Sequence, residues 1–178
     1  MIGIEVPNVV FKTRVRDESI GGDNPYRWQD VTTEELFAGK KIVLFSLPGA
    51  FTPTCSTYQL PRYEELYDEF KKYNVDEVYV LSVNDSFVMN KWLEYQNIKK
   101  VKPIPDGSGI FTRQMGMLVE KQPEGFGYRS WRYAAVVEDM TVTAWMEEPG
   151  RSDNYVQDPY MVSNPENVLE FLGKFLPE

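Results

Sequence analysis

The sequence predicts an α/β protein in which helices cover both faces of a central mixed β-sheet. Two buried, strand-like runs at residues 41–46 and 78–83 are each followed by a stretch with helical periodicity, which is typical of β-to-α units. Further along, two β-favouring segments flank Asp139-Met140, and an apolar helical pattern closes the sequence. A chain of 178 residues can bury one good core, and no repeat or interior linker divides it, so we expect a single domain over residues 1–178.

The N-terminal part predicts a β-hairpin extension followed by a short helix. Residues 9–15 favour a strand, and the turn-rich run Gly21-Gly22-Asp23-Asn24-Pro25 comes next. Thr32 and Glu35 then stand at the spacing of a capping box, which predicts one or two helical turns that end near Gly39.

The first β-to-α unit joins strand 41–46 to a helix with one apolar face. That face is formed by Tyr63, Leu66, Tyr67 and Phe70. Pro61 lies inside the helical pattern, where its ring removes one backbone hydrogen bond and clashes with the preceding turn. We therefore expect the helix to kink at Pro61.

The second β-to-α unit begins with strand 78–83, and Asn84-Asp85-Ser86 provides a good cap for the helix after it. The apolar residues of that helix are Val88, Trp92 and Tyr95. The breaker-rich run 102–109 then leads to a short helix that reaches about Leu118, and to an exposed loop through Gly127.

The C-terminal part predicts a hairpin and a final helix. Segments 132–138 and 141–147 carry β-favouring residues on either side of a short turn. Asn164-Pro165-Glu166 opens the last helix, whose core face holds Val168, Leu169, Leu172 and Phe175. The order β-α-β-α-β-β-α favours a thioredoxin-like sheet, because right-handed crossovers place helices on both faces.

Composition excludes several classes of function. With 27 acidic and 19 basic residues the net charge is −8, which argues against binding to nucleic acid or to an anionic membrane. Apolar runs such as residues 42–45 are far too short to span a bilayer, and no N-terminal segment combines a basic start with an apolar core. We therefore expect a cytoplasmic protein.

The chain has one cysteine, Cys55, and no histidine. An internal disulfide, the usual zinc-binding sets and any Cys/His or Ser/His nucleophile pair are therefore impossible. Thr52 and Pro53 fit an N-cap and a first helical position, so Cys55 would lie in the first turn, where free amide groups favour a negative charge. This position predicts a reactive thiolate, and the alternative is a small buried apolar residue.

Pro48-x-x-x-Thr52-x-x-Cys55 is the active-site pattern of peroxiredoxins, and the chain resembles the type-five (type II) members of that family. Further segments that resemble the subfamily in order and spacing are Leu60-Pro61-Arg62-Tyr63, residues 83–90, Ile104-Pro105-Asp106-Gly107 and Arg129-Ser130-Trp131-Arg132-Tyr133. The chain also resembles the peroxiredoxin part of bacterial hybrids that carry a fused glutaredoxin. It ends at Glu178 without a Cys-x-x-Cys extension, so we expect any such partner to act in trans.

The resemblance implies a thiol peroxidase for hydrogen peroxide and alkyl hydroperoxides that needs no metal or bound cofactor. Cys55 would attack a peroxide oxygen and become a sulfenic acid. In the family, the arginine matching Arg132 points at the sulfur, the threonine matching Thr52 hydrogen-bonds sulfur and peroxide, and the proline matching Pro48 shields the sulfur. The structural alternatives are a surface ion pair for Arg132, a helix N-cap for Thr52 and a turn residue for Pro48. Arg129 is assigned to the solvated surface.

Because no second cysteine can resolve the sulfenic acid, the resemblance implies a one-Cys enzyme that an external thiol regenerates. We expect this reductant to be glutathione with glutaredoxin, and thioredoxin is the second candidate. The subfamily usually has histidine before Leu-Pro-Arg-Tyr, where this chain has Gln59, and a neutral amide cannot titrate as histidine does. Related proteins pair subunits around Phe51, Phe87 and Trp92, which are otherwise core aromatics, so we expect a homodimer.

Two other functions compete with the peroxidase. A redox-sensing or binding module of the same fold would be oxidised at Cys55 without efficient turnover, as the absent resolving cysteine and Gln59 would allow. A cysteine hydrolase is strongly disfavoured, because the chain has no histidine to act as the base.

Overall fold

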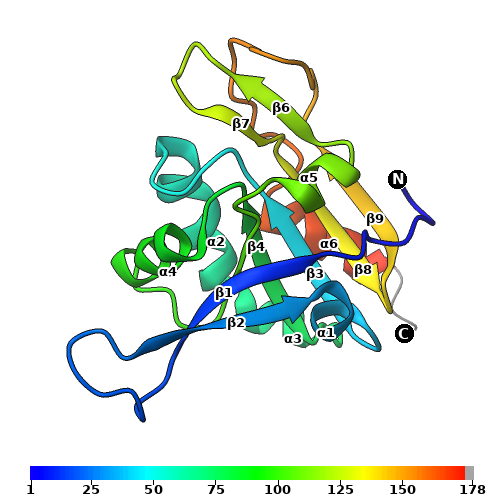
Figure 1. Ribbon diagram of the computed structural model, residues 1–178. Coiled ribbons are helices and arrows are strands. Elements are labelled where there is room, and N and C mark those ends of the chain that lie inside the picture. The colour runs from blue at the N-terminus through cyan, green and yellow to red at the C-terminus, as the bar shows by residue number, and fades with distance from the viewer. Residues whose placement is uncertain (175–178) are drawn as a thin grey trace.

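The structure is a computed structural model that describes residues 1–174, and its centre is a five-stranded sheet in the order β5-β4-β3-β8-β9 (Figure 1). The strands are β3 (Lys41–Ser46), β4 (Glu77–Ser82), β5 (Lys102–Pro105), β8 (Tyr133–Glu138) and β9 (Thr141–Glu147). β4 runs parallel to both β3 and β5, whereas β8 runs antiparallel to both β3 and β9. The predicted mixed sheet is thus confirmed.

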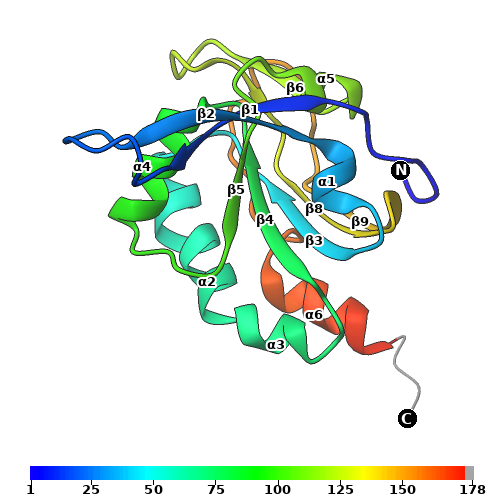
Figure 2. The same ribbon diagram turned by 60° about the horizontal axis from the view of Figure 1, so that its bottom comes forward.

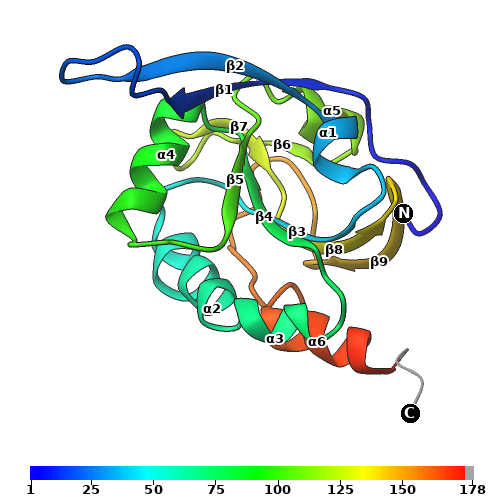
Figure 3. The same ribbon diagram turned by 90° about the horizontal axis from the view of Figure 1, so that it is seen from below.

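Each face of the sheet carries its own hydrophobic core. Alternate residues of β3 point to opposite faces, so Val43 and Phe45 join one core while Ile42 and Leu44 join the other. Helices α2 (Leu60–Glu65), α3 (Tyr67–Lys71), α4 (Ser86–Tyr95) and α6 (Pro165–Lys174) pack on the first core. The opposite face is covered by β1 (Val10–Arg16), α1 (Thr33–Phe37) and α5 (Ile110–Gln114). Figure 3 shows these layers edge-on.

The N-terminal hairpin forms as predicted. β1 pairs antiparallel with β2 (Tyr26–Thr32), and the tip of this hairpin projects from the body of the protein (Figure 2). The N-cap of the predicted capping box is confirmed, since Thr32 Oγ1 accepts a hydrogen bond from the Glu35 amide at 3.1 Å, while the Glu35 carboxylate accepts from the Thr32 hydroxyl at 3.2 Å. After α1 the chain turns at Gly39, whose φ of 68° is readily adopted only by glycine.

The helix after Cys55 begins with a π-helical turn, η1 (Cys55–Gln59), in which the Leu60 amide donates to the Cys55 carbonyl. Pro61 follows directly after this turn, inside a continuous helical run, where it has no N–H to donate. The change from π-helical to α-helical geometry thus lies directly before Pro61, and the kink expected there stays a prediction. A second interruption lies at Leu66, where φ of −95° and ψ of 7° separate α2 from α3.

Three strands were not predicted. The breaker-rich run 102–109 contains β5, whose two prolines are tolerated because it lies at the edge of the sheet. The helix expected to reach Leu118 ends at Gln114, and Leu118 instead begins β6 (Leu118–Lys121). β6 pairs with β7 (Gly127–Ser130) across the expected loop.

The C-terminal predictions agree with the structure. Asp139 and Met140 both adopt positive φ, of 45° and 72°, which matches the twist that a two-residue hairpin turn needs between β8 and β9. Asn164 Oδ1 accepts the Asn167 amide at 2.8 Å and so caps α6. Val168 and Leu172 are buried as expected, and Phe175 lies outside the described residues.

Helix α4 differs from its prediction at one position. Trp92 is fully buried, but Tyr95 is 76% exposed, and the buried face is completed by Met89 and Leu93 instead. Each helix within residues 1–174 is too short or too polar to serve as a membrane span.

Candidate active site

The register of β3 against β8 brings Cys55 and Arg132 together. Ser46, the last residue of β3, pairs with Tyr133, the first residue of β8. The loop that leads to Cys55 therefore leaves the sheet beside the point where Arg132 enters it. Arg132 Nη1 donates to Cys55 Sγ at 3.4 Å, and both residues are buried. The thiol and the guanidinium thus form one site inside the protein.

Thr52 stands immediately before the helical turn that carries Cys55. Its carbonyl accepts the Ser56 amide at 3.0 Å, so Cys55 lies in the first turn as predicted. Its hydroxyl does not act as the expected cap but donates to the Gly49 carbonyl at 2.7 Å. Because that bond uses the hydroxyl proton, the lone pairs of Oγ1 remain able to accept a hydrogen bond.

Arg132 has further partners besides the sulfur. Its Nη1 donates to Gln59 Oε1, its Nη2 donates to Asp158 Oδ1 at 2.6 Å, and its guanidinium carbon lies 5.6 Å from the centre of the Tyr160 ring. Burial acts to lower the pKa of Arg132, but the charges of Cys55 and Asp158 and their hydrogen bonds outweigh it and raise the pKa above its ordinary value. The guanidinium is therefore a permanent buried cation against the sulfur.

Two of these partners were not predicted as members of the site. The sequence indicated only that Gln59 departs from the subfamily pattern, whereas the structure buries its amide against Arg132. The departure from histidine at this position was the available signal. Asp158 lies in the segment between β9 and α6, and no local pattern singled it out.

Pro48 and Arg129 meet beside the cysteine loop. Arg129 Nη1 donates to the Pro48 carbonyl at 3.1 Å, and Nε donates to the Phe126 carbonyl at 3.1 Å. A Cβ at position 49 would lie 2.4 Å from Arg129 Nη1, so a side chain there would displace the Arg129 guanidinium. Burial lowers the pKa of Arg129, and the Cys55 charge opposes that shift. Arg129 was assigned to the solvated surface, and the half-buried position shows that this assignment is wrong.

The aromatic residues near the site separate into two groups. Trp92 is buried in the hydrophobic core. Its Nε1 donates a hydrogen bond to Ser56 Oγ at 2.9 Å, which connects α4 to the turn that carries Cys55. Phe51 and Phe87 are instead 49% and 54% exposed. Phe51 also has a φ of 65°, a strained conformation for a residue with a side chain.

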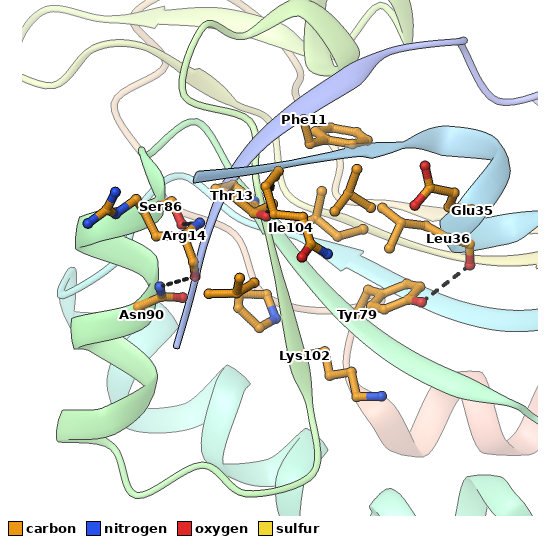
Figure 4. Close-up of a pocket in the computed structure, with 15 residues that line it drawn as sticks. Phe11, Thr13, Arg14, Glu35, Leu36, Tyr79, Ser86, Asn90, Lys102 and Ile104 are labelled. Carbon is orange, nitrogen blue, oxygen red and sulfur yellow. Dashed lines mark hydrogen bonds between the residues drawn. The ribbon is translucent and has the colours of Figure 1, made fainter. Parts of the chain in front are cut away.

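A pocket of about 440 Å³ lies away from the thiol, between the N-terminal hairpin and β5 (Figure 4). Phe11, Tyr79 and Ile104 contribute apolar lining, and Cys55 and Arg132 take no part in it. Within the described residues, no group of three or more His, Cys, Asp or Glu side chains is placed to hold a metal ion.

The family model for Redoxin matches residues 24–169 of this chain. This chain belongs to the Redoxin family. Peroxiredoxin y4vD of Sinorhizobium fredii is 64% identical over 170 residues, which cover 96% of this chain and 90% of that protein. Hybrid peroxiredoxin hyPrx5 of Haemophilus influenzae is 49% identical over 173 residues, which cover 97% of this chain and 66% of that protein.

A solved peroxiredoxin structure also resembles this chain. The Plasmodium falciparum antioxidant protein, a 1-Cys peroxiredoxin, superposes with a TM-score of 0.89 at 42% identity and covers 97% of this chain and 99% of its own. The thioredoxin-like fold and the type-five peroxiredoxin resemblance are thereby confirmed. The protein is a thiol peroxidase, and with a single cysteine in its sequence it follows a one-Cys mechanism.

Proposed function

We propose that Cys55 is the peroxidatic cysteine and that Arg132, Thr52 and Pro48 complete its site for hydrogen peroxide and alkyl hydroperoxides. The 3.4 Å contact between Arg132 Nη1 and Cys55 Sγ carries this assignment, because a buried permanent cation stabilises a thiolate. The sulfur attacks one peroxide oxygen, the O–O bond breaks, and an alkoxide or hydroxide leaves and takes up a proton. Cys55 is left as a sulfenic acid.

Each neighbour has a distinct role in that step. Arg132 offers fixed donors to the negative charge that passes from sulfur to the leaving oxygen. Thr52 Oγ1 has lone pairs free and accepts the hydrogen bond of the incoming peroxide O–H. Pro48 presents its carbonyl to Arg129. We assign its ring the role of shielding the sulfur from water, as the family resemblance implies.

Thr52→Val tests the role of the hydroxyl, because valine keeps the shape of threonine and removes the acceptor. We expect oxidation of Cys55 by hydrogen peroxide to slow by roughly 10- to 100-fold, as for loss of one hydrogen bond to a group that carries charge. Thr52→Ser retains the hydroxyl and should stay close to the parent rate. Equal rates for the valine variant and the parent protein, measured by stopped-flow loss of the thiol, would remove Thr52 from the mechanism.

The reductant must be an external thiol, since the sequence has one cysteine. A first thiol condenses with the sulfenic acid, which releases water and forms a mixed disulfide, and a second thiol then restores Cys55. We propose glutathione with glutaredoxin for this role, on the resemblance to hybrids with a fused glutaredoxin, and thioredoxin as the alternative. Cys55 is fully buried, so either protein reductant requires a local opening of the site.

The first experiment adds one equivalent of hydrogen peroxide to the reduced protein and follows both thiol loss and intact mass. We expect oxidation orders of magnitude faster than for an ordinary exposed thiol, a mass gain of one oxygen, and no such gain in Cys55→Ser. Steady-state turnover with glutathione and glutaredoxin, or with thioredoxin, then identifies the reductant. Fast oxidation that neither system reverses would favour the redox-sensing alternative.

We further propose that the protein forms a homodimer through an exposed aromatic band made of Trp28, Phe51, Phe87 and Tyr95. Trp28 packs edge-on against Phe87 at 5.5 Å between ring centres, and Phe51 lies 6.0 Å from Tyr95. All four side chains are about half exposed or more. Such a group of large exposed aromatics is typical of protein interfaces. Trp92 is buried in the core and takes no part in this band.

Phe87→Glu tests the dimer, because it removes the aromatic ring that packs on Trp28 and places a hydrated, charged side chain where the partner would pack. We expect the variant to elute as a monomer in size-exclusion chromatography with light scattering. Ile2→Glu is the matched control, since Ile2 is 68% exposed near the N-terminus, far from α4 (Figure 1). A dimer that survives Phe87→Glu would place the interface elsewhere.

A further inference from the structure

The Arg132 guanidinium is held in place by side chains from two separate parts of the chain. Gln59, which contacts Nη1, comes from the same π-helical turn as Cys55. Asp158, which accepts from Nη2 at 2.6 Å, comes from the segment of residues 148–164 between β9 and α6. The Arg132 Nε is buried without a hydrogen-bond partner among the described residues, so the side chain is not fixed through that atom.

Of the residues that contact Arg132 from this segment, Asp158 is the one that carries charge. Tyr160 faces the guanidinium, but burial raises the pKa of Tyr160, so its ring stays neutral at physiological pH. Gln59 is a neutral amide. The Asp158 carboxylate therefore makes the charge-assisted bond that opposes movement of the guanidinium towards or away from the sulfur.

The position of Asp158 is set by a buried carboxylate, Glu148. The two oxygens of Glu148 accept the amides of Met161, Val162 and Ser163 at 2.7, 2.9 and 2.7 Å, and also the Ser163 hydroxyl at 2.6 Å. The Tyr63 hydroxyl donates to the Ser163 carbonyl at 2.6 Å and ties the same segment to α2. The backbone just after Asp158 and Tyr160 is thus fixed against the core.

We propose that Asp158 is a positioning residue for the peroxide reaction, which fixes Arg132 so that Nη1 faces Cys55 Sγ. This inference rests on the assignment of Cys55 and Arg132 proposed above. Asp158 touches neither the sulfur nor the substrate. It acts through Nη2, because a guanidinium is planar and a partner on one terminal nitrogen sets the direction of the other. The acceptor oxygen of Asp158 sets the direction of this bond, and its charge makes the bond stronger.

The experiment compares Asp158→Ala, which removes the acceptor, with Asp158→Asn, which keeps an acceptor oxygen and removes the charge. We expect the alanine variant to lose roughly 10- to 100-fold in the rate of Cys55 oxidation by hydrogen peroxide, the effect typical of a misplaced catalytic group. The asparagine variant should recover most of that rate. Asp153→Ala is the control, since Asp153 lies in the same segment but accepts from the Glu120 amide, away from Arg132.

Each result has a single interpretation. A fast parent protein with an equally fast Asp158→Ala variant would overturn the positioning role and leave the proposed function intact. Equal losses of oxidation rate in the alanine and asparagine variants would also overturn the positioning role. The rate would then depend on the negative charge at position 158 and not on an acceptor that orients Arg132. A slow parent protein would instead refute the assignment of Cys55 itself. Asp158 is 46% exposed, so Asp158→Ala is expected to fold, and its circular dichroism spectrum checks this.

Discussion

Replacing Arg132 by methionine should slow oxidation of Cys55 by hydrogen peroxide by roughly 100- to 1,000-fold, the cost typical of removing a preorganised donor to developing charge. Methionine fills much of the same space without donors, so the thiolate loses its 3.4 Å partner and Gln59 Oε1 loses its donor as well. Arg132→Lys keeps a positive charge, but an ammonium lacks the planar fork that reaches Cys55 and Asp158 together. We therefore expect the lysine variant to be intermediate.

Arg62→Met is the matched control for this measurement. Arg62 also pairs with two carboxylates, those of Glu65 and Glu166, but its side chain is 44% exposed. Exposed pairs contribute little, so the control should oxidise within about twofold of the parent rate. A methionine variant at position 132 that reacts as fast as this control would show that the buried arginine is not needed for peroxide reduction.

Local sequence patterns predicted the parts of the fold whose signals lie within a few residues. Strand β3 was predicted at residues 41–46, because a short buried apolar run bounded by polar residues leaves little ambiguity. Strand β5 was missed because Pro103 and Pro105 argue against a strand unless its edge position is known. The π-helical turn directly before Pro61 was missed because such a turn has no distinct sequence pattern.

The same division applies to the candidate site. Pro48, Thr52 and Cys55 lie in one short motif and could be read from the sequence, and Arg132 followed from the family resemblance. Arg129 and Asp158 reach the site only through tertiary structure, since one lies on the unpredicted strand β7 and the other lies in a segment without regular structure. Contacts of this kind depend on where whole segments pack, which residue spacing does not encode.

Glu148→Gln should markedly lower the stability of the protein. The carboxylate is fully buried and meets only donors from Met161, Val162 and Ser163. An amide of the same shape has one oxygen and one NH₂ group, so at least one backbone N–H would face another donor and stay unsatisfied. We expect the free energy of unfolding to fall by about 2–3 kcal/mol, as for a buried donor that loses a charged acceptor.

Urea denaturation measures this change, and a lower midpoint with an unchanged m-value would indicate lost stability without a change of denatured state. Glu166→Gln provides the control, because that carboxylate is 51% exposed and pairs only at the surface with Arg62, which predicts a change of no more than about 0.5 kcal/mol. Since the segment that Glu148 fixes also carries Asp158, Glu148→Gln should slow peroxide reduction even where the protein remains folded. An unchanged urea midpoint would show that this segment is held by its apolar contacts and not by the buried carboxylate.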